Sequence, residues 1–254
     1  MATYKKRGYK PKTKVEREAK IEEGSTTAEV FKTLDTGASK TEAWVEKNQK
    51  YILGIVGAIA ICVLGYIGYE QFIQEPKEAE AANEIFQAQQ YYEEAMNAPS
   101  PDSLYNLALN GGEGKYGFLD IIDNYGGTSA GNRAKYYAGM AYLNLKDYQN
   151  AIDYLDRYKG KDEMTGPLAK GAIGDAFVQL NQNEEALKYY EEAAAMSDNG
   201  VTAPRFLLKA GIIALNLGKA DVALTHFKAI EDNYPNAPEA LRAEIYVGQA
   251  EAMQ

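Results

Sequence analysis

The stretch "FLDIIDNYGGTSAGNRAKYYAG" at residues 118–139 recurs as "FKAIEDNYPNAPEALRAEIYVG" at residues 227–248. The two stretches align at a constant offset of 109 residues without a gap. They share the first phenylalanine, an Asp-Asn-Tyr triplet and, near the end, an arginine, an alanine, a tyrosine and the last glycine. This many shared residues in one register indicates a structural unit that the chain repeats.

Small residues recur between these two stretches at a helical-repeat period. The glycines are 35, 37 and 37 residues apart, and an alanine follows each of the first three by 12 residues: Gly139, Gly174, Gly211 and Gly248, with Ala151, Ala186 and Ala223. Small side chains allow paired helices to touch closely, and a period near 34 residues is typical of a helix-turn-helix repeat.

Three stretches carry a family resemblance: "GMAYLNLKDYQNAIDYL", "GDAFVQLNQNEEALKYY" and "GIIALNLGKADVALTHF", at residues 139–155, 174–190 and 211–227. They resemble tetratricopeptide repeats, although Ala214 replaces the usual aromatic residue and Lys146 the usual turn glycine. The resemblance implies an all-α superhelix. We expect about three complete repeats, with a degenerate first unit and a capping last unit, over residues 77–254.

Ahead of the repeats, "YILGIVGAIAICVLGYIGY" at residues 51–69 has no charged side chain. A bilayer core about 30 Å thick needs roughly 20 such residues in a helix. Fifty residues precede the run, so an uncleaved anchor is favoured over a signal peptide. We predict an anchor helix over residues 40–73, because "SKTE" at residues 39–42 has the form of a capping box.

Lysines predict the orientation of this anchor. Four precede it closely, Lys32, Lys40, Lys47 and Lys50, and only Lys77 follows it closely. Cytoplasmic flanks carry the excess of Lys and Arg, so residues 1–39 are expected to be a basic, mostly disordered cytoplasmic tail. Residues 1–50 have a net charge of +4 and the rest of the chain −13. An alternative for "YKKRGYKPKTK" in the tail is binding of nucleic acid or lipid headgroups.

Two further features of the anchor concern its surroundings. Aromatic residues near its ends are expected at the headgroup interface: Trp44, Tyr51, Tyr66 and Tyr69. Small residues share one helical face on which another transmembrane helix could pack: Gly54, Ala58, Cys62 and Gly65. Cys62 is the only cysteine, so an intrachain disulfide is excluded.

The residues that catalysis or metal binding would need are scarce. His226 is the only histidine, so histidine-based metal clusters and catalytic triads are excluded. The segment "NGGEGKYG" at residues 110–117 lacks the spacing of a phosphate-binding loop and is predicted to be a plain loop. We therefore expect no catalytic residue, no metal, no cofactor and no enzymatic activity.

A repeat superhelix instead offers a concave groove lined by the first helix of each repeat. With each repeat glycine taken as position 8, the predicted groove residues are Arg133, Tyr136, Met140, Leu143 and Asn144, then Asp175, Val178 and Gln179, then Arg205, Leu208, Ile212, Leu215 and Asn216. Position 13 is an amide in each repeat, which would suit an extended backbone. Most of the other positions are apolar, so we expect the groove to hold hydrophobic or aromatic side chains.

The anchor, basic tail and acidic repeat array together resemble the YfgM-type ancillary translocon subunits of bacteria. The resemblance implies a single-pass inner-membrane protein with a periplasmic repeat domain. Its implied partners are the SecYEG translocon and a membrane-anchored, PpiD-like prolyl isomerase. Secreted client chains are expected in the groove and membrane lipid around the anchor. A further expected partner is the ribosome, contacted by the tail. A scaffold for the envelope or for cell division, and a membrane-anchored signalling adaptor, are the alternatives.

Overall fold

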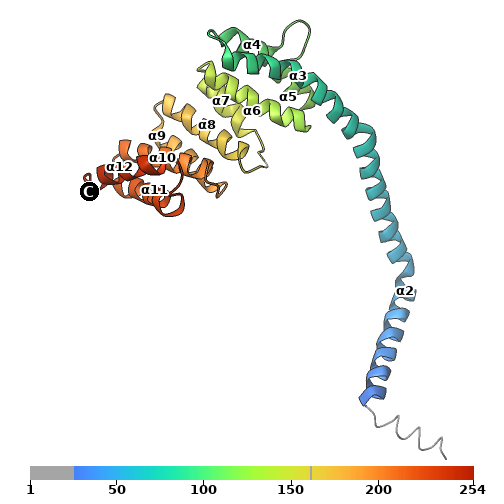
Figure 1. Cartoon of the computed structure of the whole chain (residues 1–254). Coiled ribbons are helices and arrows are strands. Elements are labelled where there is room, and N and C mark those ends of the chain that lie inside the picture. Colours follow the sequence, from blue (N-terminus) through green and yellow to red (C-terminus); the bar gives the residue numbers. More distant parts are fainter. Residues whose placement is uncertain (1–25, 161) are drawn as a thin grey trace, which may run out of the picture. The chain divides into compact units, whose positions relative to one another are not determined.

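The computed structural model describes residues 26–160 and 162–254, with side chains described from residue 42 onward. The chain divides into two compact units, residues 1–69 and residues 70–254 (Figure 1). The first contains the long helix α2, Thr26–Tyr69, and the second contains the remaining elements.

Helix α2 is continuous over 44 residues. It begins at Thr26, so residues 26–39, which the sequence assigned to the tail, are helical, and no helix starts near Lys40. A capping residue does not interrupt a helix that is already formed, because extending a helix costs far less than nucleating one. The predictions for residues 1–25 of the tail lie outside the described residues.

The apolar part of α2 is exposed within its unit. One helical stretch of the described chain, Glu42–Asn97, is long and apolar enough to cross a membrane. Its most apolar window has a mean hydropathy of 2.2, and none of that window is buried. The predicted interface aromatics are all more than half exposed: Trp44, Tyr51, Tyr66 and Tyr69. A methyl group at Gly54 or Gly65 would have no neighbour within 4 Å. By length and composition, this helix is a candidate for a membrane span.

The second unit consists of helices joined by short turns. It starts with one π-helical turn, η1 (Glu70–Gln74), and continues with α3 (Glu75–Asn97), α4 (Asp102–Asn110), α5 (Phe118–Tyr125), α6 (Ser129–Asn144), α7 (Tyr148–Asp156), α8 (Thr165–Gln179), α9 (Asn183–Ala195), α10 (Thr202–Asn216), α11 (Ala220–Asn233) and α12 (Ala240–Glu251). The loop predicted at residues 110–117 lies between α4 and α5 and is closed by a single bridge between Gly112 and Lys115.

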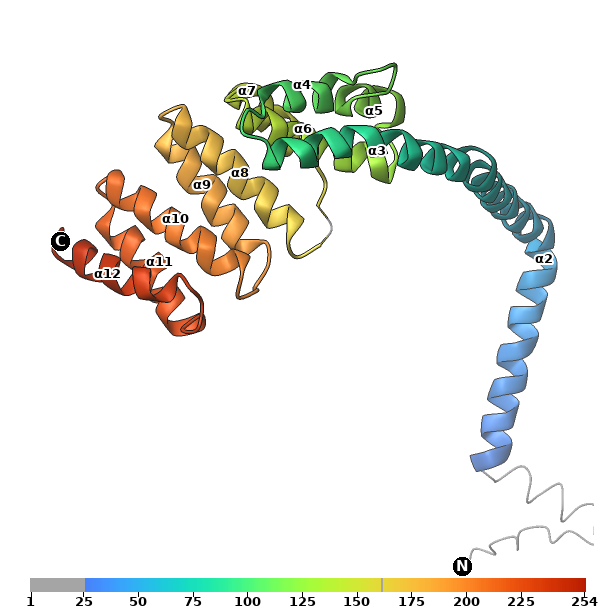
Figure 2. The ribbon, with the colours of Figure 1, turned by 45° about the horizontal axis from the view of Figure 1, so that its top comes forward.

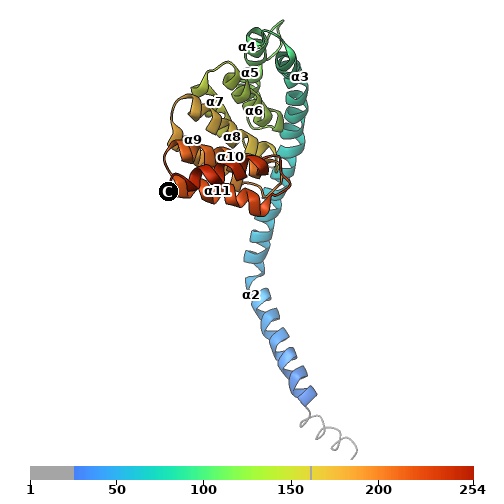
Figure 3. The same cartoon turned by 60° about the vertical axis from the view of Figure 1, so that its left-hand side comes forward.

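Three helical pairs form the centre of the second unit: α6 with α7, α8 with α9, and α10 with α11. Figures 2 and 3 show these pairs side by side in order along the chain. The second helix of each pair also packs against the first helix of the next, so α11 contacts α12. Helices α3 to α5 form an irregular first unit, and α12 is the last helix that the structure describes.

The first three repeat glycines lie at close contacts between paired helices. A methyl group at Gly139 would come within 2.5 Å of the Leu155 side chain, and one at Gly174 within 2.6 Å of the Tyr190 ring. At Gly211 it would overlap the Phe227 ring. Only glycine leaves room for these large side chains, which explains the spacing seen in the sequence. The alanines that follow the glycines are fully buried: Ala151, Ala186 and Ala223.

The two similar stretches, residues 118–139 and 227–248, also make the same aromatic contact in the structure. Phe118 stacks on Tyr137 with ring centroids 5.3 Å apart, and Phe227 stacks on Tyr246 at the same 5.3 Å. Both phenylalanines are fully buried. The 109-residue offset therefore corresponds to a repeated join between the second helix of one unit and the first helix of the next.

The turn inside each of the three helical pairs contains one residue whose backbone adopts the left-handed conformation. Lys146, Asn181 and Gly218 have φ angles of 63°, 57° and 73°. Glycine adopts this conformation without cost, asparagine tolerates it, and a lysine is strained there. The turn therefore forms at Lys146 although the glycine of the repeat pattern is absent.

Candidate functional site

The candidate site is a cleft of about 440 Å³ between α6 and α8, named here the inter-repeat cleft. It is lined by Leu143, Asn144, Lys146, Tyr148, Asp175, Val178, Gln179 and Tyr190. Five of these residues were predicted as groove residues from the repeat register: Leu143, Asn144, Asp175, Val178 and Gln179. The structure therefore brings the predicted residues of two successive repeats together around one opening.

The carboxylate of Asp175 is fixed at one side of the cleft by two neighbours. It accepts a hydrogen bond from the Tyr190 hydroxyl at 2.6 Å and pairs with the Lys209 ammonium at 2.5 Å. Burial, followed by the negative charge of Asp175, raises the pKa of the Tyr190 phenol well above its usual range. Tyr190 therefore stays protonated and keeps Asp175 in place, and Lys209 neutralises its charge.

Two amides at the cleft keep free hydrogen-bonding groups. Asn144 uses its Nδ2 to donate to the carbonyl of Met140 at 2.8 Å, which leaves Oδ1 as an acceptor. Gln179 uses its Oε1 to accept from the Tyr148 hydroxyl at 3.4 Å, which leaves Nε2 as a donor. One acceptor and one donor match the N–H and C=O groups of a peptide backbone. Leu143 and Val178 add apolar side chains to the lining of the same cleft.

The remaining predicted groove positions have other roles in the structure. Leu208 and Leu215 are 3% and 6% exposed and belong to the core around α10. Helix α10 is covered by neighbours on both sides, so these positions are not available to a ligand. The half-buried residues among the predicted set pack against the repeat cores: Tyr136, Met140 and Ile212. Arg205 and Asn216 are exposed.

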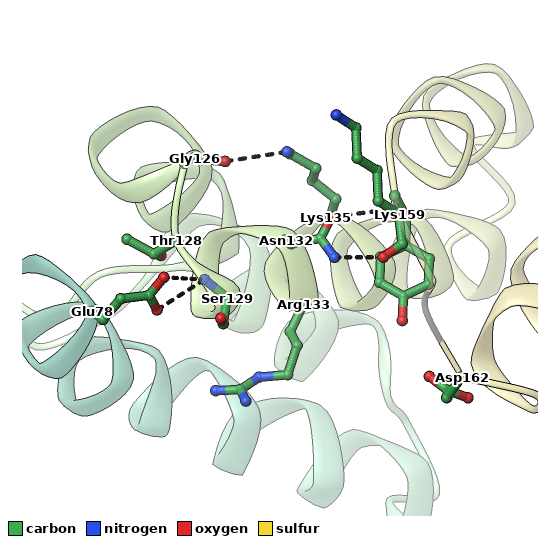
Figure 4. Close-up of a pocket in the computed structure, with 11 residues that line it drawn as sticks. Glu78, Gly126, Thr128, Ser129, Asn132, Arg133, Lys135, Lys159 and Asp162 are labelled. Atoms are coloured by element: carbon green, nitrogen blue, oxygen red, sulfur yellow. Dashed lines mark hydrogen bonds between the residues drawn. The ribbon is translucent and has the colours of Figure 1, made fainter. Parts of the chain in front are cut away.

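Arg133 lies away from the inter-repeat cleft, beside a second pocket of about 500 Å³. In Figure 4, the carboxylate of Glu78 accepts from the backbone N–H of Ser129 at the start of α6, at 2.9 and 3.0 Å. Lys135 donates to the carbonyl of Gly126 at 3.3 Å and extends to the opposite side of α6 from Arg133. An acidic side chain of the protein thus already occupies the positive end of this helix.

Among the described residues, no group of three or more His, Cys, Asp or Glu side chains could hold a metal ion. His226 lies 2.9 Å from Glu191 on neighbouring helices, away from the cleft residues. The arrangement at the inter-repeat cleft is suited to binding a short polypeptide segment.

Three cleft residues were missed by the sequence analysis: Lys146, Tyr148 and Tyr190. They come from the turn after α6 and from the second helices of two repeats, whereas the prediction considered only first helices. A signal was present, since Lys146 stands where the repeat pattern has glycine. A long cationic side chain at that turn reaches the end of the groove.

Comparison with known proteins agrees with the helical repeats. The family model described as tetratricopeptide repeat matches residues 119–163 and 172–238. No curated protein matches the chain. Similar solved structures include PcrH from Pseudomonas aeruginosa, at 20% identity and a TM-score of 0.41, covering 48% of this chain and 93% of that one.

Two more structures are similar. PcrH in complex with the chaperone-binding region of PopB has 22% identity and a TM-score of 0.37, covering 50% of this chain and 96% of that one. A kinesin-light-chain protein of Podospora anserina with nearly identical TPR-like repeats has 11% identity and a TM-score of 0.49, covering 69% of this chain and 87% of that one. The residues that the family model matches, 119–163 and 172–238, overlap the three packed helical pairs.

Proposed function

We propose that this protein is a non-enzymatic, membrane-anchored adaptor that binds protein partners in the inter-repeat cleft. In this proposal, residues 51–69 span the bacterial inner membrane and the repeats lie in the periplasm. The observation that carries it is the cleft itself, where Leu143 and Val178 line the same opening as the amides of Asn144 and Gln179. These groups suit an extended segment that presents an apolar side chain.

The partner that we propose is the Sec translocon, with a membrane-anchored prolyl isomerase or an emerging secreted chain in the cleft. The resemblance to ancillary translocon subunits supports this choice, as does the charge pattern on either side of the anchor. On the anchor, Gly54, Ala58 and Gly65 would face a translocon helix. Within the anchor's own unit, a methyl group at Gly54 or Gly65 meets no atom within 4 Å. Larger residues there would leave the fold of the chain unchanged and block only an external helix.

The test is affinity purification of the tagged full chain from native membranes in a mild detergent, followed by mass spectrometry. A groove variant, Val178→Arg, is compared with Val222→Arg, because both valines are half-buried and Val222 lies on α11 outside the cleft. A third variant changes Gly54, Ala58 and Gly65 to leucine.

We expect translocon subunits and the isomerase with the unchanged chain and with Val222→Arg. Val178→Arg should lose the periplasmic partner, and the leucine variant should lose the translocon. Recovery of cell-division or envelope-assembly proteins in their place would overturn the translocon assignment. Partner recovery that is equal for Val178→Arg and Val222→Arg would overturn the role of the cleft.

A further inference from the structure

Three cationic side chains gather at the end of the repeat domain where α6 begins and α7 ends. Lys135 lies on α6, and Arg157 and Lys159 come just after α7. In Figure 4, the side chains of Lys135 and Lys159 extend in the same direction. Burial lowers the pKa of Lys135, and the charges of Arg157 and Lys159 lower it further, so both lie within electrostatic range of its ammonium. These three residues are named here the basic cluster.

Contacts within the domain hold the basic cluster in place. Asn132 on α6 donates from Nδ2 to the carbonyl of Lys159 at 2.9 Å and accepts from the backbone N–H of Lys159 at 3.0 Å. This pair of hydrogen bonds fixes the segment after α7 against α6. The Arg157 guanidinium lies 5.4 Å from the centroid of the Tyr154 ring. The cluster is therefore arranged before any ligand binds.

Acidic side chains at this end of the domain are engaged with backbone groups. Glu78 accepts from the N–H at the start of α6, at 2.9 and 3.0 Å. Asp162 accepts from two backbone N–H groups around the start of α8, at 2.6 and 2.9 Å. Among the residues whose side chains the structure describes, no carboxylate lies within 4 Å of a cationic group of the basic cluster.

The next repeat shows the same lysine with its charge neutralised. Lys135 and Lys170 are 35 residues apart, and each stands four residues before its repeat glycine. Lys170 lies 3.2 Å from Asp156 and 3.5 Å from Glu192. Lys135 has other cations beside it instead. The basic cluster thus lacks the anionic partner that the following repeat provides for its own lysine.

The position of the cluster in the chain indicates which anion is within reach. Glu78, which contacts the start of α6, stands nine residues after Tyr69, the last residue of the proposed span. Residues 70–78 are helical, so they extend about 14 Å. The headgroup layer adds about 5 to 8 Å to each side of the hydrocarbon core, and charges act over about 8 Å at physiological salt. This end of the domain therefore lies within electrostatic range of lipid headgroups.

We propose that the basic cluster binds the phosphate groups of anionic phospholipids in the membrane that holds the anchor. The proposal rests on the membrane span of the proposed function. Lysine and arginine donate charge-assisted hydrogen bonds to phosphate oxygens, and each cation near an anionic surface strengthens binding about fivefold. Asn144 and Gln179 of the inter-repeat cleft lie at the opposite ends of α6 and α8. The lipid contact therefore directs the cleft away from the membrane surface.

Fluorescence quenching of the full chain in lipid nanodiscs tests the contact. In a Cys62→Ser background, Gly127→Cys carries a fluorophore beside the cluster, because Gly127 is exposed and a methyl group there would have no neighbour within 4 Å. The quencher is phosphatidylcholine with a spin label on its headgroup. Quenching should be at least about twofold stronger in discs with phosphatidylglycerol than in discs of phosphatidylcholine alone. The difference should disappear in about 1 M salt, where charges act over about 3 Å.

Two triple variants with the same change of charge identify the residues responsible. The difference should be lost when the basic cluster is neutralised by Lys135→Gln, Arg157→Gln and Lys159→Gln. It should persist when three lysines that pair with carboxylates elsewhere are neutralised by Lys188→Gln, Lys219→Gln and Lys228→Gln.

Equal quenching in the two kinds of disc, or an equal loss for both triple variants, overturns the lipid contact and leaves the adaptor role of the cleft standing. A chain that does not incorporate into the discs overturns the proposed span together with the lipid contact. Loss of partner recovery in the purification described above, with the quenching difference intact, would overturn the adaptor role alone.

Discussion

Gly211 and Gly248 hold the same place in successive repeats, 37 residues apart, yet their surroundings are opposite. At Gly211 the Phe227 ring fills the space that a side chain would need, and at Gly248 that space is open. The residues beside them differ in the same way, since Leu208 is 3% exposed and its equivalent, Ile245, is 68% exposed. One sequence pattern thus marks a filled helix contact inside the stack and an open one at its last helix.

The difference shows that a repeat pattern predicts the shape of a helix face but not what covers it. The glycine lets a neighbouring helix approach closely, and that helix provides the large side chain that packs against the glycine. In the interior both come from this chain. At α12 the described residues provide only the glycine, and no large side chain lies against it.

The largest effect should separate a filled contact from an open one. Phe227→Ala removes a fully buried ring that stacks on Tyr246 and should lower the free energy of unfolding by about 3 to 5 kcal/mol. Leu241→Ala changes an exposed side chain and should alter it by about 0.5 kcal/mol or less in the monomer. Urea denaturation of the diluted chain, followed by circular dichroism, measures both. Equal losses would show that α12 is already covered within one chain.

A smaller change at the glycines sharpens the same comparison. Gly211→Ala places a methyl group in the Phe227 ring and should lower the free energy of unfolding by about 1 to 3 kcal/mol. Gly248→Ala meets open space in a helix and should raise it by up to about 1 kcal/mol. The two midpoints of urea denaturation should therefore move in opposite directions. A loss at both positions would contradict the open surroundings of Gly248.

Alkaline pH should report on the interior of the stack through Tyr190. Burial and then Asp175 raise the pKa of this phenol above its unfolded value near 10. A raised pKa means that the folded state holds the proton more tightly, so this contribution is complete below about pH 10 and is lost above it. Unfolding free energies should therefore fall more steeply above pH 10 for the unchanged chain than for Tyr190→Phe. Parallel pH curves would show that folding does not raise the pKa of this phenol.

The smallest effect is expected at the turns within the repeats. Lys146→Gly removes a strained left-handed lysine, at φ 63°, and should raise the free energy of unfolding by about 0.5 kcal/mol. The reverse change, Gly218→Lys, introduces the same strain at φ 73° and should lower it. Thermal unfolding of the two variants provides the measurement. A gain for Gly218→Lys would contradict the assignment of the strain to the backbone.

The repeats were predictable because local signals recur. The spacing from Gly139 to Gly248 and the shared Phe118 and Phe227 correspond to contacts in the structure. The capping box at residues 39–42 does not mark a helix start, because the helix that begins at Thr26 extends through Ser39.

The site was only partly predictable. Leu143, Asn144, Asp175, Val178 and Gln179 line one cleft, as the register suggested. Leu208 and Leu215 do not, because α10 is buried on more than one side and the register alone cannot distinguish its faces. The pairing of Asp175 with Lys209, 34 residues away, depends on the stacking of two repeats, which local sequence does not reveal.

The most direct measurement of the proposed adaptor function is photo-cross-linking in living cells. A photoreactive amino acid is placed at Val178 in the inter-repeat cleft or, as the matched control, at Val222 on α11. We predict that Val178 captures a translocon-associated isomerase or a secreted chain and that Val222 does not. If Val178 captures no protein, or captures the same proteins as Val222, the inter-repeat cleft is not the binding site.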